Sequence, residues 1–100
     1  MPELKDVKQT IQELKPLLEN ERVRLLDFKL QPGKKTVQHS HPDTIVYALN
    51  DQKLRFILPD DEKKVVELKS GQAIWMNAET HVAENIGKTE ARSVVIELKK

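Results

Sequence analysis

Three histidines are the residues whose type and spacing point most directly to chemistry, and this 100-residue chain has no others. His39 and His41 are separated by one residue, and side chains two apart on an extended strand project from the same face. Their imidazoles can therefore converge on one ion, and His81 is left to supply a third nitrogen. Three neutral imidazoles leave further coordination positions to water or a ligand, as in an open, reactive site. The sequence predicts a divalent transition-metal site and does not select among Fe, Mn, Ni, Cu and Zn.

Strands are the elements that must position these histidines. From Glu21 onward, apolar residues recur at every second position, as they do in half-buried strands. Three such runs are Leu26, Phe28 and Leu30; Leu54, Phe56 and Leu58; and Val94, Ile96 and Leu98. Turn residues separate the runs, and no helical stretch between them is long enough to connect parallel strands. The pattern predicts an antiparallel all-β sandwich or small barrel.

The N-terminal segment, residues 1–19, follows a different period. Its apolar residues fall at intervals of three and four, which predicts one apolar stripe on a helix from about Glu3 to Leu18; they are Leu4, Val7, Ile11, Leu14 and Leu18. Pro16 interrupts this pattern, because proline removes a helical hydrogen bond and clashes with the preceding turn. Either the helix ends near Lys15 or the stretch is partly extended. We expect an amphipathic segment that covers the body of its own domain, which comprises residues 20–100.

The histidine pattern resembles that of the cupin superfamily. The first cupin motif begins with glycine, five residues, histidine, any residue and histidine, and the second ends with histidine, three residues and asparagine. The residues that match the two motifs are Gly33, His39, His41, Gly71, His81 and Asn85. The resemblance covers about Asn20 to Leu98. It implies a small, single-domain, RmlC-like protein with a double-stranded β-helix, or jelly roll.

Both motifs are incomplete in this chain. A glutamate normally follows the second histidine by three or four residues and also binds the metal. Depending on the alignment, its position falls on Thr44, Ile45 or Val46, none of which is a carboxylate. The second motif lacks its proline and inner glycine, and its turn is one residue short. The resemblance thus implies a three-histidine site that leaves the ion at full charge and favours an anionic ligand.

By this resemblance, the chain binds a divalent metal through His39, His41 and His81 together with a small anionic organic ligand. Some cupin dioxygenases that act on thiols or diketones use three histidines without a carboxylate, which implies a mononuclear non-haem oxygenase. No residue identifies a substrate, so catalysis stays open. One alternative is a non-enzymatic module that binds or senses a small ligand without a functional metal. Another is an interaction protein that self-associates through edge strands or its N-terminal segment. Cupin jelly rolls commonly pair, so the resemblance also implies a homodimer.

The walls of the pocket are predicted from strand direction. The candidates are Gln38, Thr44, Tyr47 and Trp75, followed by Asn77 and Glu79, with Val37 on the face of the two close histidines. The four aromatic residues are expected mainly in the core of so small a domain; they are Phe28, Phe56, Tyr47 and Trp75. Tyr47 and Trp75 also carry polar groups that can orient a ligand.

Composition and missing motifs exclude other classes of function. The 17 basic and 16 acidic residues leave a net charge of +1, too small to attract nucleic acid or an anionic membrane. The absence of cysteine excludes disulfides, thiolate nucleophiles and cysteine-bound zinc. No nucleophile elbow, phosphate-binding glycine loop or His-Glu-x-x-His sequence is present. Without a basic leader followed by an apolar stretch, or a long apolar span, we expect a cytoplasmic protein.

Overall fold

The fold is seen in a computed structural model that describes residues 13–99. These residues form nine strands and no helix, which confirms the all-β prediction. The strands are β1 (Leu14–Glu19), β2 (Val23–Leu30), β3 (His39–His41), β4 (Thr44–Ala48), β5 (Gln52–Ile57), β6 (Lys63–Leu68), β7 (Ala73–Met76), β8 (Glu79–Asn85) and β9 (Ala91–Leu98). Within this part of the chain there is accordingly no helix of the length and hydrophobicity that crossing a membrane requires.

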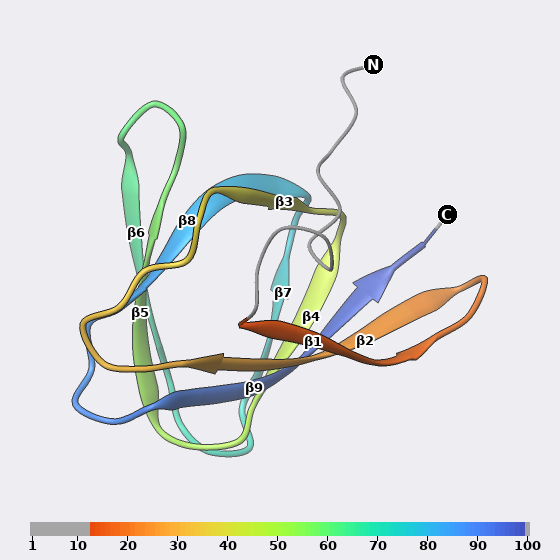
Figure 1. Cartoon of the computed structure of the whole chain (residues 1–100), viewed down its shortest axis with the longest axis horizontal. Coiled ribbons are helices and arrows are strands. Elements are labelled where there is room, and N and C mark those ends of the chain that lie inside the picture. The colour runs from red at the N-terminus through yellow and green to blue at the C-terminus, as the bar shows by residue number, and fades with distance from the viewer. Residues whose placement is uncertain (1–12, 100) are drawn as a thin grey trace.

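The strands form two antiparallel sheets, one with the order β1-β2-β9-β4-β7 and the other with the order β3-β8-β5-β6. Several neighbours are far apart in the sequence, such as β2 with β9 and β3 with β8. In Figure 1, β5 and β6 stand along one side, whereas β1, β2 and β9 run across the molecule. This arrangement is the predicted jelly roll, and it brings remote segments together at the histidines.

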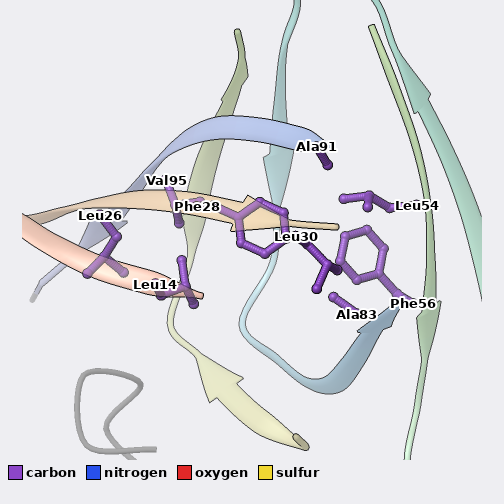
Figure 2. Packing of buried hydrophobic residues seen from close by; sticks show 9 residues of the cluster. All are labelled: Leu14, Leu26, Phe28, Leu30, Leu54, Phe56, Ala83, Ala91 and Val95. Atoms are coloured by element: carbon purple, nitrogen blue, oxygen red, sulfur yellow. The ribbon is translucent and has the colours of Figure 1, made fainter. Parts of the chain in front are cut away.

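The core lies between the inner faces of the two sheets. Figure 2 shows Phe28 and Leu30 of the five-stranded sheet next to Leu54 and Phe56 of the other sheet, and Leu14 and Val95 belong to the same cluster. Leu26, Phe28 and Leu30 are buried as predicted for β2, and so are Leu54 and Phe56 of β5. Burying each large apolar side chain contributes about 1.5–3 kcal/mol, which makes this cluster the main stabilising element of the barrel.

Strand β9 alternates with the predicted period of two, but the residues that face the core are not the predicted ones. Ala91, Ser93, Val95 and Glu97 are buried, whereas Val94, Ile96 and Leu98 lie on the outer face of the sheet. A strand with apolar residues at nearly every position does not reveal which face turns inward, because a shift by one residue exchanges the two faces. The inner position of Glu97 matters for the site.

The predicted helix is wrong over residues 14–18, which belong to strand β1. This strand pairs with β2, with a register shift between Pro16 and Leu18. Because proline breaks a helix and is tolerated at the edge of a sheet, Pro16 favours the extended alternative. The rest of the predicted stripe, Leu4, Val7 and Ile11, lies outside the described residues. The segment defined as residues 1–19 thus contributes its last six residues to the sheet.

The turn at Gly33 aligns the segment that leads into β3. Gly33 has a φ of 77°, in the left-handed region that favours glycine, and its amide donates to the Asn85 carbonyl over 2.9 Å. Lys35 then forms an isolated antiparallel β-bridge with Glu84 through the backbone, and the Thr36 amide donates to the Ala83 carbonyl. The chain therefore runs antiparallel to β8 from Gly33 onward.

Candidate metal centre

Strand pairing gathers the three histidines on one face. His39 of β3 lies directly opposite His81 of β8, and directly opposite residues of an antiparallel pair project from the same side. His41 is two residues from His39 and shares that side. The side chain of Glu79, opposite His41, lies there as well. The strand pair β3–β8 thus carries all four of these side chains on one face.

The geometry brings the predicted ligands close together. His39, His41 and His81 are 3%, 9% and 3% exposed, and their nearest ligand atoms all lie within 4.8 Å of one another. The ring centroid of His39 is 4.8 Å from those of His41 and His81, which are 5.3 Å apart. Nitrogens bound to one tetrahedral ion are about 3.4 Å apart, so small ring movements complete the site. These three histidines are close enough to hold a metal ion.

Each Nδ1 atom already faces a hydrogen-bond acceptor. For His39 the acceptor is the Val37 carbonyl oxygen at 2.8 Å, and for His81 it is Glu79 Oε2 at 2.7 Å. His41 Nδ1 lies 2.5 Å from Glu97 Oε2. A carbonyl or ionised carboxylate oxygen only accepts, so each Nδ1 carries a proton, and in the neutral form of each ring Nε2 retains its lone pair. Three Nε2 atoms are thereby prepared as metal ligands.

Glu97 is the site residue that sequence reasoning missed. Its side chain is 1% exposed, and Oε1 accepts hydrogen bonds from Arg24 Nε at 2.8 Å and Nη2 at 2.6 Å. In the register of β4 and β9, Glu97 lies directly opposite Thr44, where one alignment puts the missing cupin glutamate. A carboxylate is thus present one strand away, behind His41. The alternation of β9 gave no signal for this position, because apolar residues occupy both faces of the strand.

The two carboxyl groups beside the histidines are stabilised as anions. Burial alone would raise the pKa of Glu97, but the hydrogen bonds from His41 and Arg24 outweigh burial and hold its pKa below the ordinary value. Burial alone would likewise raise the pKa of Glu79. Hydrogen bonds from His81 and from Lys64, whose Nζ lies 2.5 Å from Glu79 Oε1, instead lower this pKa below its ordinary value. Ionised carboxylates orient the rings and increase the basicity of ligating imidazoles.

Burial keeps two of the imidazoles neutral. It lowers the pKa of His39 from 6.5 to about 4, although the Val37 carbonyl acts in the opposite direction. It also lowers the pKa of His81 from 6.5 to about 4, against the effect of the Glu79 carboxylate. A metal must compete with a proton for a nitrogen lone pair, and at neutral pH no proton occupies these two rings.

The histidines open into a pocket between the sheets. The space measures about 500 Å³, including its part open to solvent. Most of its wall is apolar, with Leu14, Phe28, Val46, Leu54, Phe56, Met76, Ala83 and Val95 around His39, His41 and His81. Thr44, Asn77, Glu79 and Ser93 provide the other polar groups. Phe56 packs on His81, with ring centroids 4.6 Å apart, and supports that ring from the apolar side.

Several predicted pocket residues lie elsewhere. Tyr47 and Trp75 are 42% and 52% exposed and belong neither to the pocket nor to the core. They face outward because Thr44 and Val46 of β4, and Met76 of β7, occupy the alternating inner positions. Gln38 is also exposed and outside the pocket wall, as is Val37, which contributes its backbone carbonyl to His39. Of the predicted pocket residues, Thr44, Asn77 and Glu79 do line the pocket.

Asn85, which matches the second motif, has a structural position. It is 1% exposed, and its Nδ2 donates to the Leu30 carbonyl at 2.8 Å and to the Thr89 carbonyl at 2.9 Å. Its Oδ1 accepts from the Gly87 amide. The side chain therefore joins the ends of β2 and β8 at a distance from the pocket.

Comparisons with known proteins agree with this architecture. No protein-family model and no curated protein matches the sequence. Among solved structures, a cupin domain from Bordetella pertussis Tohama I aligns with a TM-score of 0.78 and 26% identity, over 87% of this chain and 92% of that chain. An RmlC-like cupin family protein from Methanocaldococcus jannaschii aligns with a TM-score of 0.69 and 17% identity, over 97% and 87% of the two chains. The polyketide cyclase RemF from Streptomyces resistomycificus aligns with a TM-score of 0.64 and 20% identity, over 100% and 81%.

The chain is a member of the cupin superfamily. It has the double-stranded β-helix fold and the two histidine-bearing segments, and it lacks the glutamate of the first motif.

The lowered pKa values predict how the metal-free protein responds to acid. Above pH 6.5, His39 and His81 are neutral in both the folded and unfolded chain and add no pH dependence. Between pH 6.5 and 4 the unfolded chain takes up protons that the folded chain cannot, so the free energy of unfolding falls with pH, by about 1.4 kcal/mol per pKa unit for each ring. Below pH 4.5, loss of the Glu79 and Glu97 anions acts in the same direction. Urea unfolding of chelator-treated protein between pH 8 and 4 measures the change. Constant stability down to pH 5 would contradict neutral buried rings.

Proposed function

We propose that this protein binds one divalent transition-metal ion through the Nε2 atoms of His39, His41 and His81, and that a small anionic organic ligand completes the coordination. The observation that carries the proposal is the hydrogen-bonding state of the three rings. Every Nδ1 is engaged by an acceptor in the surrounding protein. Three lone pairs on Nε2 therefore remain for an ion, and two further polar contacts, from Arg24 and Lys64, hold the acceptor carboxylates in place.

The donor set and the pocket together support the proposed ligand. Neutral imidazoles do not reduce the charge of the ion, and the pocket wall contains no lysine or arginine in the described part of the chain. The ion is therefore the one strong attraction for an anion inside the pocket. The apolar wall around it suits a ligand with one anionic oxygen or sulfur group and an apolar body.

The leading catalytic version of this function is a mononuclear non-haem oxygenase. A bound divalent ion would supply Lewis acidity and, where it is redox-active, electron transfer to dioxygen. The protein itself orients the three rings and keeps the ligand in an apolar pocket. The side chains of Phe28, Leu54 and Phe56 in the pocket wall limit the access of water to the ligand. The competing version binds the same ligand without turnover.

The first prediction is one metal ion per chain. Protein prepared without a histidine tag and dialysed against Zn²⁺ or Fe²⁺ should retain about one equivalent by elemental analysis, and His39→Ala or His81→Ala should abolish tight binding because two nitrogens remain. Ser40→Ala is the matched control. Ser40 lies between the two ligands of β3 and contacts Thr80 at 2.7 Å on the opposite face, so this variant should bind like the wild type. Unchanged metal content in both histidine variants would refute the proposed site.

A second prediction concerns the carboxylate behind His41. Glu97→Gln removes the charge that fixes Nδ1 of His41 and should weaken Zn²⁺ binding about 10–100-fold, the usual effect of removing such a partner. Glu84→Gln is the control, since Glu84 also pairs with an arginine, Arg55 at 2.8 Å, but outside the pocket. Competition with a chromophoric chelator gives both affinities. Equal losses of Zn²⁺ affinity in the two variants would show that Glu97 acts only through its charge and not through its contact with His41.

A third prediction separates catalysis from binding. Iron-loaded protein is mixed with thiols, diketones and small organic acids, and O₂ uptake is followed with an electrode. An oxygenase should consume O₂ with at least one of these ligands, and His41→Ala should eliminate the uptake. Ligands that bind, as judged by a change in the absorption spectrum of the Co²⁺-loaded protein, but give no uptake would support the non-enzymatic version.

A further inference from the structure

A lysine extends from the edge of the four-stranded sheet toward the metal pocket. In strand β6, Val66 packs against the core and Leu68 is buried, so Lys64, which shares their alternation, projects from the inner side of the sheet. Lys64 also lies directly opposite Phe56 of β5, whose side chain is part of the pocket wall. The side chain of Lys64 is therefore on the side of the sheet that faces the pocket.

The ammonium group of Lys64 reaches the residues around His81. Its Nζ lies 2.5 Å from Glu79 Oε1, although β5 lies between β6 and β8 in the sheet. The other oxygen of the same carboxylate, Oε2, accepts from His81 Nδ1 at 2.7 Å. Glu79 lines the pocket, whereas the side chain of Lys64 is 44% exposed. A positive charge thus lies at the boundary between pocket and solvent, one carboxylate away from a candidate metal ligand.

Lys64 can bind a further anion while it contacts Glu79. Within residues 13–99, the Glu79 carboxylate is the one acceptor within hydrogen-bonding distance of its ammonium group, which has three donors. Lysine is a point charge on a flexible chain, so its remaining donors can turn toward an anion at the open side of the pocket. Arg24, in contrast, is 12% exposed and directed at Glu97 behind the histidines. Lys64 is therefore the better-placed cation for a ligand.

The charges around the histidines favour a doubly charged ligand. Lys64 offsets the charge of Glu79, and Arg24 offsets that of Glu97. The three imidazoles are neutral as ligands, so both charges of a bound divalent ion remain unbalanced. A ligand with one negative charge would leave a residual positive charge in an apolar pocket, where an unbalanced charge is costly. A ligand with two negative charges leaves none.

We propose that Lys64 binds a second anionic group of the ligand, at the end opposite to the group that coordinates the ion. The inference rests on the proposed function, which supplies the ion and the apolar pocket. It narrows the ligand to a short molecule with an anionic group at each end, such as a dicarboxylate. The methylene groups of such a ligand would contact the apolar wall, and Lys64 would determine the specificity for the second charge.

The contacts of Lys64 also limit the length of this ligand. The path from Lys64 Nζ through the Glu79 carboxylate and the His81 ring to an ion about 2.1 Å from Nε2 is at most about 12 Å long. Bonds of about 2.1 Å to the ion and about 2.8 Å to the ammonium group leave at most about 7 Å between the two anionic oxygens. Malonate, succinate and glutarate fit within this limit.

Ligand binding to the Co²⁺-loaded full chain tests the inference, with the absorption spectrum of the cobalt ion as the readout. Wild-type protein should bind succinate at least about ten-fold more tightly than butyrate, in which a methyl group replaces one carboxylate. Lys64→Met removes the ammonium group and keeps an unbranched side chain, so it should weaken succinate binding about ten-fold and leave butyrate binding unchanged. Lys64→Arg keeps the charge and should retain the preference for succinate.

Lys63→Met is the matched control. Lys63 precedes Lys64 in β6, lies opposite Ile57 and projects from the outer side of the sheet, so this variant should bind both acids like the wild type. Equal affinities of the wild-type protein for succinate and butyrate would overturn the inference. Equal weakening of both acids by Lys64→Met would also overturn it, because Lys64 would then act only by positioning Glu79. Neither result would contradict the proposed function, whereas Co²⁺-loaded protein that binds no anion of either kind would contradict both.

Discussion

The register between β3 and β8 is the constraint on which the site depends. It sets His39 opposite His81 and His41 opposite Glu79, so that three imidazoles and one carboxylate share a face of a single strand pair. A slip of one residue would turn the β8 side chains to the other face and leave the two β3 histidines alone. The bonds from Gly33 and Thr36 to the β8 backbone prevent this slip before β3 begins. The glycine turn of the motif therefore helps to assemble the candidate metal centre, although Gly33 does not line the pocket.

Around the histidines, charged side chains are buried even though removing a charge from water costs free energy. Glu97 is 1% exposed, and the partners that offset its desolvation, Arg24 and His41, are themselves nearly buried. Replacing such an ion pair with apolar residues is often neutral or stabilising, so stability gives little reason for its presence. A better reason for the presence of Glu97 is that it orients His41, since a carboxylate acceptor fixes both the tautomer and the ring angle of a histidine that binds a metal. Glu79 and Lys64 do the same for His81, and the Val37 carbonyl does so for His39 without any charge.

The sequence was sufficient for the fold and for the histidines. Alternating apolar residues and glycine turns define short antiparallel strands, and spacing by two puts His39 and His41 on one face whatever the surrounding structure. Besides the helix predicted over residues 14–18, which is strand β1, what failed was the choice between the two faces of a strand. Apolar residues occupy both sides of β9, and the sequence contains no local signal that Val95 and Glu97 face inward. The same ambiguity misplaced Tyr47 and Trp75, whose outward positions follow from the pairing of β4 with β7 and β9. Tertiary pairing, which is not encoded within a single strand, decides each case.

The tautomers of the three histidines provide the most direct measurement of this account. Long-range ¹H–¹⁵N correlation spectra of the metal-free protein at neutral pH distinguish protonated from unprotonated ring nitrogens. The account predicts that His39, His41 and His81 all carry their proton on Nδ1 and that all three Nε2 atoms are unprotonated. A proton on Nε2 of any of these rings would contradict it, because that nitrogen would then have no lone pair to offer a metal.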